Sequence, residues 1–363
     1  MAEIFTHKYL IAQNKIRHAI ENLKIDDRLP GERVLAKELG ISYMTVRKAV
    51  ENLVEEGALY RIAKKGTYVA DPKLKRKNCI GYFLDSSIEE GVTSPYYSLI
   101  FNALEKEAAK QGNALIYFSD SYEGDFLCES LNIIAKLDGV IISCFPRIEP
   151  IVDKIKELLP VVCIDNRSLD GSIPSLTLDN FASVVDSINY LFSLGHERIG
   201  FITGLDDSNI GRNRLAGYIS ALKSHGLDED MGLIYKGDYS FETGKRGADY
   251  FLSMKTPPTA IMCANDTMAI GSIKELNRRG LTVPDDISVM GFDDISVASH
   301  ITPALTTVSA PVEDIAKQAI ELLTAVLDGN EPEKRHLTLP CRLVLRDSCA
   351  TNDSKTTTSK LAG

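Results

Sequence analysis

Residues 259–294 read TAIMCANDTMAIGSIKELNRRGLTVPDDISVMGFDD, and their pattern sets the architecture of most of the chain. Two short apolar runs, AIMC and ISVMGF, lie on either side of an amphipathic segment, 267–279. A strand, a helix and a second strand in this order predict two parallel strands joined by a crossover helix. Polar residues follow each strand, with Asn265 after the first and Asp293 after the second. The sequence therefore predicts a parallel sheet whose carboxyl edge carries polar side chains.

The same alternation of apolar runs and amphipathic segments fills the chain from Cys79 onward. Further apolar runs, separated by helical segments such as 97–111, 180–194 and 211–224, read CIGYFL, ALIYFS, GVIISC, PVVCID and RIGFITG. This stretch of about 270 residues is too long for one open sheet of this repeat. We therefore expect an α/β fold of two side-by-side lobes over residues 79–348, with a ligand cleft at the carboxyl ends of their strands.

The length of 363 residues is about two and a half times the usual domain of ~150, so two or three folded units are expected, and 44% hydrophobic and 25% charged residues are typical of folded domains. No apolar run approaches the ~18 residues of a membrane helix, and residues 1–20 lack the continuous apolar stretch of a secretory signal. We therefore expect a cytoplasmic protein with no membrane partner. The C-terminal residues 349–363, polar from Thr351 onward, are expected to form a disordered tail.

Seven cysteines are spread over the chain with no C-x-x-C pair. Their odd number and irregular spacing argue against a disulfide framework or a zinc site. These two remain the alternatives to reduced cysteines. Cys128, Cys144, Cys163 and Cys263 lie in apolar or helical contexts, so we expect them to be reduced core residues. No metal or other cofactor is predicted.

The net charge of −9 is unevenly distributed along the chain. Residues 1–78 hold 16 Lys and Arg against 10 Asp and Glu, so they carry +6 and the rest of the chain carries −15. A basic small module joined to an acidic large one indicates that the small module meets a polyanion.

The small module, residues 1–70, has the pattern of three helices followed by two strands. Apolar stripes with helical spacing predict a first helix over 8–23, a second that ends before Gly40 and a third that begins at the N-cap Ser42. The inner faces are expected to comprise Ile16, Ile20, Leu23, Val34, Leu35, Leu39, Val46, Ala49, Val50, Leu53 and Val54. The turn LGIS between the last two helices predicts a helix-turn-helix, and 58–70 alternate around Lys-Lys-Gly as the strands of a wing.

The outward side of the third predicted helix is the candidate DNA-reading surface, because the N-terminal end of such a helix enters a major groove. Basic residues gather there, at the start of the second helix and in the wing, rather than over the whole module. The residues expected to contact DNA are Arg33, Tyr43, Met44, Thr45, Arg47, Lys48, Lys64, Lys65 and Gly66. A solvated helix face is the alternative interpretation.

Residues 29–70, LPGERVLAKELGISYMTVRKAVENLVEEGALYRIAKKGTYVA, closely resemble the DNA-binding domain of the GntR family of bacterial transcription regulators. The resemblance implies that Arg33, Thr45 and Arg47 contact operator phosphates and bases, and that the wing reaches the minor groove. Two positions depart from the family pattern. Tyr43 replaces an Arg and Lys64 replaces a Gly, which implies an operator preference different from the common one.

Signatures of catalysis are missing from the larger part of the chain. It contains no phosphate-binding G-x-x-x-x-G-K-[ST], no G-x-G-x-x-G and no G-x-S-x-G, and HERIG at 196 lacks the second His of a zincin. The polar residues at the predicted strand ends and helix starts are Asp165, Asn166, Arg167, Arg214, Asn265, Asp266, Asp293 and Asp294. Carboxylate, amide and guanidinium groups of this kind bind a polyhydroxylated ligand by fixed hydrogen bonds. The alternative for Asn265, Asp266 and Asp293 is that they cap the following helix or turn.

The motifs RNRLAGY, GDYSF, ANDTMAIG and GFDD resemble those of the effector domain of the LacI/GalR family, related to periplasmic sugar-binding proteins, and the resemblance extends over 79–348. It implies that Arg214, Asn265 and Asp293 hold sugar hydroxyls and that Tyr239 stacks on the sugar ring. It further places Tyr96, Tyr97, Asp165 and Arg167 at the ligand. A winged helix stands in place of that family's own DNA-binding head. The combination resembles arabinose-responsive repressors, which makes arabinose a candidate effector.

These patterns together predict a winged helix-turn-helix over 1–70, a linker over 71–78 and a two-lobed periplasmic-binding-protein-like effector and dimerisation domain over 79–348. The predicted function is a transcription repressor that binds operator double-stranded DNA as a homodimer and is released by a monosaccharide. It is not expected to be an enzyme. The alternatives are a sugar-modifying enzyme with a DNA-binding module, a periplasmic solute-binding protein, and a repressor that its ligand tightens on DNA.

Overall fold

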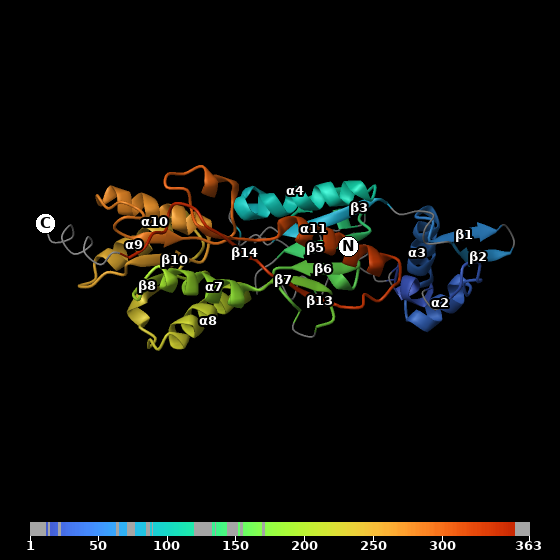
Figure 1. Cartoon of the computed structure of the whole chain (residues 1–363). Coiled ribbons are helices and arrows are strands. Elements are labelled where there is room, and N and C mark those ends of the chain that lie inside the picture. The colour runs from blue at the N-terminus through green and yellow to red at the C-terminus, as the bar shows by residue number, and fades with distance from the viewer. Residues whose placement is uncertain are drawn as a thin grey trace.

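The computed structural model describes residues 12–13, 15–20, 23–62, 65–70, 77–84, 88, 90–119, 133–134, 136–143, 152, 155–168 and 171–352. Figure 1 shows these residues as a row of three parts: the N-terminal head, a middle lobe and a distal lobe. No helix of the described ranges is both long and apolar enough to cross a membrane.

The head is the predicted winged helix-turn-helix. Helix α2 (Glu32–Leu39) ends at Gly40, whose φ of 65° is the left-handed conformation that glycine adopts without strain. Helix α3 (Tyr43–Glu55) begins at Ser42, whose Oγ accepts a hydrogen bond from the Thr45 amide at 3.2 Å. The wing strands β1 (Leu59–Ile62) and β2 (Gly66–Val69) pair antiparallel.

The core of the head joins the first helix to α3 and the wing. Ile16, Val46, Ala49, Val50 and Leu53 are fully buried as predicted. Val34 is an exception, because its side chain is 50% exposed while that of Leu35 is 2% exposed. Consecutive side chains of an α-helix point about 100° apart. The short helix α2, of eight residues, turns Leu35 toward the core, so the side chain of Val34 points toward solvent. The prediction that Val34 lies on the inner face is therefore wrong.

The middle lobe is built on a six-stranded parallel sheet. Its strand order is β13-β7-β6-β5-β3-β4. The strands are β3 (Cys79–Leu84), β4 (Ala114–Phe118), β5 (Gly139–Ser143), β6 (Val161–Ile164), β7 (Ser175–Leu178) and β13 (His336–Leu339). Helices α4 (Pro95–Lys110) and α11 (Val312–Leu327) pack against each other and against this sheet.

The distal lobe is built on a four-stranded parallel sheet with the order β11-β10-β8-β9. The strands are β8 (Ile199–Ile202), β9 (Ile234–Tyr235), β10 (Ala260–Cys263) and β11 (Ser288–Met290). The helices are α7 (Asn180–Ser193), α8 (Asn209–Ser224), α9 (Phe241–Leu252) and α10 (Asp266–Arg278). The strand, helix and strand predicted over 259–294 are β10, α10 and β11. The two-lobed α/β fold is therefore confirmed.

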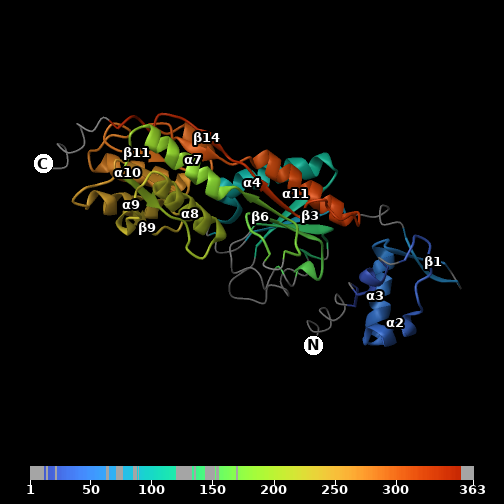
Figure 2. The same cartoon turned by 60° about the horizontal axis from the view of Figure 1, so that its bottom comes forward.

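The chain passes between the two lobes at three places: from β7 to α7, from β12 (Thr307–Ser309) to α11, and from β13 to β14 (Arg342–Val344). Strands β12 and β14 pair antiparallel at the junction. Figures 1 and 2 both place the head beside the middle lobe and away from the distal lobe.

The edges of the effector domain differ from the expected boundaries. The Ala350 amide bonds to Ser288 Oγ at 3.1 Å, and the Asn352 amide bonds to the Leu194 carbonyl at 2.8 Å. Residues 349–352 therefore belong to the distal lobe rather than to a tail. At the other edge, Lys77 bonds through its amide to Asp138 Oδ1 at 3.0 Å, while residues 71–76 of the predicted linker and 353–363 of the tail lie outside the described ranges.

Two of the four predicted core cysteines, Cys163 and Cys263, are buried in β6 and β10. Burial raises the pKa of each thiol to about 12, so both are protonated at neutral pH. Cys128 and Cys144 lie outside the described residues.

Candidate effector site and DNA-binding surface

The head presents one exposed surface that combines the starts of α2 and α3. Its side chains include Arg33, Tyr43, Met44, Arg47 and Lys48. The Arg33 guanidinium lies 5.8 Å from the centre of the Tyr43 ring, which joins the two helices at this surface. Of the remaining residues predicted to contact DNA, Lys65 is exposed in the wing, Gly66 is half-buried, and Lys64 lies outside the described residues.

Thr45 does not lie on the outward side of α3, as the sequence pattern predicted. Its side chain is 7% exposed, and its Oγ1 lies 2.6 Å from Ser42 Oγ, inside the cap of the helix. Thr45 is one helical turn before the buried Ala49, and residues four apart share a face. The prediction that Thr45 faces outward is therefore wrong, because the phase of α3 turns this residue toward the core.

The predicted effector site begins at the carboxyl ends of two strands, one in each lobe. Asp165 follows β6 in the middle lobe with a φ of 66°, and Asp293 comes shortly after β11 in the distal lobe with a φ of 113°. Both φ values lie in a region that is costly for residues other than glycine. Both side chains are buried, with exposures of 5% and 7%. These constrained turns aim two carboxyl groups toward the same place.

Arg214, on α8, is the cation between these two acids. Its Nη2 lies 3.6 Å from Asp293 Oδ1, and its charge acts on both Asp165 and Asp293. The side chain is 4% exposed and is fixed on three further sides. Its Nε donates to Asn180 Oδ1 at 2.8 Å, its Nη1 donates to the Ala264 carbonyl, and its guanidinium lies 3.5 Å from the centre of the Phe292 ring. Arg214 is therefore held in place by contacts within the protein.

The positive charge of Arg214 only partly offsets the cost of burying the negative charges of Asp165 and Asp293. Burial raises the pKa of Asp165 to about 6 and that of Asp293 to about 7, despite the opposing effect of Arg214. Tyr96 donates a hydrogen bond to Asp165 Oδ1 at 3.3 Å. Asp165 Oδ2 is buried and has no hydrogen-bond partner in the described part of the chain. A buried acceptor without a partner costs free energy, which a ligand hydroxyl would recover.

Tyrosines surround this cluster of acids. The rings of Tyr96 and Tyr97 meet edge to face at 5.2 Å, at the start of α4. Tyr239 reaches the cluster from the distal lobe, and its pKa is raised mainly by burial and also by the charges of Asp293 and Asp165. Its ring lies over Gly204, where an added Cβ would collide with the ring carbons. Gly204 is therefore the residue that makes room for Tyr239.

Asn265 and Asp266 take the structural roles that the sequence left open. Asn265 caps α10 by accepting a hydrogen bond from the Met268 amide at 2.9 Å, and its Nδ2 donates to the Tyr239 carbonyl at 3.0 Å. Asp266 is fully buried and accepts from the Ile295 amide at 2.9 Å. Asn265 therefore positions Tyr239 at the cluster, whereas Asp266 supports the turn behind Asp293.

Arg167 is not brought into the cluster. Its side chain is exposed, and its charge acts on His336, whose pKa is lowered by burial and then by Arg167. The neighbouring Asn166 instead bridges the lobes, because its Oδ1 accepts from Asn209 Nδ2 at 3.0 Å. The left-handed turn at Asp165 points consecutive residues in different directions, which the sequence does not reveal.

Two residues that sequence reasoning missed, Asn180 and Phe292, hold Arg214 from either side. Phe292 could have been noticed, since it precedes Asp293 in the GFDD motif. Asn180 follows β7 and starts α7, so its role depends on the chain passing between the lobes there.

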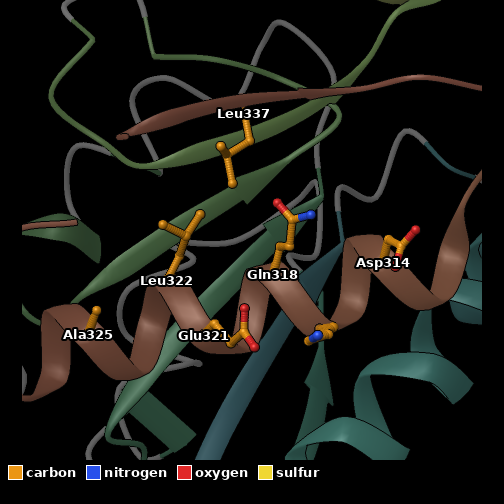
Figure 3. Close-up of a pocket in the computed structure, with 7 residues that line it drawn as sticks. Asp314, Gln318, Glu321, Leu322, Ala325 and Leu337 are labelled. Carbon is orange, nitrogen blue, oxygen red and sulfur yellow. The ribbon is translucent and has the colours of Figure 1, made fainter. Parts of the chain in front are cut away.

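A separate hollow of about 300 Å³ lies outside the predicted site. Figure 3 shows that it is formed by the outer face of α11 together with Leu337 of β13. None of the predicted effector-binding residues lines it. Among the described residues, no group of three or more His, Cys, Asp or Glu is arranged to hold a metal ion.

Comparisons with known proteins agree with this architecture. Residues 8–69 match the family model of bacterial regulatory proteins of the gntR family, and 188–349 match the periplasmic binding protein-like domain. The HTH-type transcriptional repressor CytR of Escherichia coli is 31% identical over 263 residues, which is 71% of this chain and 76% of that protein.

Solved structures of LacI-family regulators share the fold. A regulatory protein from Chloroflexus aggregans superposes with a TM-score of 0.67 at 28% identity, covering 76% of this chain and 99% of that one. A sugar-binding transcriptional regulator from Escherichia coli superposes with a TM-score of 0.63 at 29% identity, covering 76% of this chain and all of that one. This chain therefore belongs to the LacI/GalR-type transcriptional repressors, and it carries a DNA-binding domain of the GntR type at its N-terminus.

Proposed function

We propose that this repressor binds operator DNA as a homodimer and is released from it by a neutral monosaccharide bound between its lobes. The observation that carries the ligand assignment is the fixed Arg214 between Asp165 and Asp293, beside the unpartnered Asp165 Oδ2. A guanidinium with two carboxyls offers both donors and acceptors, which is what vicinal hydroxyl groups need. The sugar-binding regulator from Escherichia coli supports the same ligand class.

The charge of the cluster favours a neutral ligand over an anionic one. Two acids face one guanidinium, so a sugar phosphate or sugar acid would add negative charge beside Asp165 and Asp293. Like charges in a buried site repel strongly. We therefore expect unmodified pentoses or hexoses, arabinose among them, to bind more tightly than their phosphates.

The DNA assignment rests on the exposed surface of the head. Tyr43, Met44, Arg47 and Lys48 lie in the N-terminal part of α3, the end that enters a major groove in this motif, and Arg33 of α2 lies beside Tyr43. One such head makes few base contacts, and a symmetric dimer doubles them. The boundaries that we propose are a head over 1–70 and an effector and dimerisation domain that begins near Lys77.

A thermal-shift screen of the full-length protein against pentoses, hexoses and their phosphates tests the ligand assignment. A sugar present at 100 times its Kd stabilises the protein by about 2.7 kcal/mol, which is readily measured. Stabilisation by phosphates alone would contradict the proposal.

Light scattering of the same protein gives its oligomeric state, and a monomer at working concentration would contradict the dimer. Turnover of a sugar with or without ATP would instead favour the enzyme alternative.

A further inference from the structure

We infer that Arg28 is a further DNA-contacting residue, which acts from the wing although it precedes the helix-turn-helix in the sequence. This inference rests on the proposed DNA-binding function of the head. Arg28 lies two residues before Pro30, in the segment Asp26–Leu29. In the folded head this segment runs alongside strand β2 of the wing.

The segment Asp26–Leu29 forms a third strand-like edge of the wing. The Asp26 amide donates to the Val69 carbonyl at 2.9 Å, the Val69 amide donates to the Asp27 carbonyl at 3.0 Å, and the Leu29 amide donates to the Thr67 carbonyl at 2.8 Å. Arg28 pairs antiparallel with Tyr68 in this ladder. The side chain of Leu29, only 4% exposed, anchors the segment in the core of the head. The backbone of Arg28 is therefore fixed to β2.

The Arg28 side chain runs along β2 to the turn of the wing. A Cβ on Gly66 would lie 2.8 Å from Arg28 Nε and 3.4 Å from both Arg28 Cζ and Nη2. The guanidinium therefore packs against Gly66, and a side chain at this position would displace it. Gly66 also has a φ of 135°, which favours glycine independently.

Arg28 differs in its pairing from Arg47 and Arg61, two other exposed arginines of the head. Arg47 bonds to Glu51 at 3.0 Å, and Arg61 bonds to Glu32 at 2.8 Å. Arg28 is exposed and has no ion-pair partner among the residues that the structure describes. A planar guanidinium held at the tip of a wing, next to the exposed Lys65, suits a phosphate or the edge of a minor groove.

The test uses full-length protein and duplexes that this protein selects from a random-sequence library. Arg28→Ala is expected to weaken binding about 10-fold and to reduce the slope of log K against log salt by about one. Arg28→Lys keeps the positive charge but loses the planar guanidinium that packs on Gly66, so it is expected to restore the salt slope and only part of the affinity. Lys106→Ala, which removes one exposed positive charge from α4 in the middle lobe, serves as the matched control.

The outcomes separate this inference from the proposed function. Wild-type affinity and salt slope in Arg28→Ala, with binding lost in Arg47→Ala, would overturn the inference and leave the DNA-binding surface of α3 intact. Failure of the protein to select any duplex would instead overturn the proposed function. Full wild-type affinity in Arg28→Lys would contradict a contact that needs the planar guanidinium, and thermal melts of each variant verify that the head is folded.

Discussion

Arg214 is the residue on which the proposed ligand site depends most. Arg214→Ala removes the only cation that faces Asp165 and Asp293 in the described part of the site, together with its donors to a ligand. We expect sugar affinity to fall by about 2–4 kcal/mol, because buried polar groups are left without partners. Calorimetry with the sugar found in the screen measures this loss.

Two further variants make the Arg214 experiment decisive. Asp165→Asn keeps the shape of the side chain and removes its charge, so it weakens binding without emptying the site. Arg246→Ala removes an exposed arginine of α9 that pairs with Asp238 at 3.7 Å, and its sugar affinity should equal that of the wild type. Unchanged sugar affinity in Arg214→Ala would refute the placement of the ligand.

The acids also predict how sugar affinity depends on pH. Burial raises the pKa of Asp165 to about 6 and of Asp293 to about 7, so both carboxyls bind protons in the free protein at pH 5. A ligand hydroxyl that donates to an ionised carboxylate favours the ionised form and lowers its pKa. Binding therefore releases protons, and affinity should rise from pH 5 to pH 8.

Calorimetry in buffers of different ionisation enthalpy counts the protons released on sugar binding. Release near pH 6–7 that disappears in an Asp165→Asn, Asp293→Asn double variant would agree with the two pKa values. Proton uptake on binding would mean that the ligand favours the protonated carboxyls, contrary to this expectation.

At the scale of elements, the contact between α7 and α8 sets the position of Arg214. A Cβ on Gly217 would lie 2.6 Å from the Phe181 carbonyl oxygen and 3.1 Å from Val184 Cβ. Gly217→Ala must therefore push the two helices apart, which costs about 1–3 kcal/mol of stability. Since Arg214 on α8 bonds to Asn180 on α7, sugar affinity should fall as well.

Thermal melts and sugar titrations of Gly217→Ala test this coupling between helix packing and the site. Asn213 lies on the exposed side of the same helix, so Asn213→Ala should change neither the melting temperature nor the sugar affinity appreciably. A Gly217→Ala protein that melts lower but binds sugar as the wild type does would show that the site tolerates movement of α8.

At the scale of the whole molecule, a ligand between the lobes must act on the head through the middle lobe. Figures 1 and 2 place the head beside that lobe. Lys77 anchors the connection, because its Nζ donates to the Leu137 carbonyl at 3.0 Å and its amide donates to Asp138. Burial lowers the pKa of Lys77, and the charge of Glu56 in the head partly opposes that effect.

We expect the sugar to lower operator affinity by about 10- to 100-fold, which is a coupling of roughly 1.4–2.8 kcal/mol. Lys77→Ala should reduce this coupling by about 0.5–2 kcal/mol while leaving sugar affinity unchanged. Operator titrations with and without the sugar measure both. Equal operator affinity in the two conditions would reject the switch, and tighter binding with sugar would reverse its direction.

Local signals in the sequence were sufficient for the elements but not for every site residue. Gly40 and Ser42 mark the ends of helices through their own conformations, so both caps were predictable. Thr45 was misplaced because the phase of α3 depends on which face the core covers. Asn180 and Arg167 depend on the chain crossing between lobes and on the turn at Asp165, which no local pattern contains.

The three crossings between the lobes have a consequence for how such proteins diversify. The described residues of the middle lobe lie within 79–178 and 312–339, whereas those of the distal lobe lie within 180–309 and 342–352, so neither lobe is one continuous piece of chain. A gene fusion with a single breakpoint therefore cannot replace one lobe and keep the other, because each lobe is built from two separate segments of the chain. The chain passes from the head to the effector domain once, between Ala70 and Lys77, so one breakpoint there exchanges the whole DNA-binding head. Such an exchange keeps both lobes of the effector domain together and changes only the operator that the protein binds.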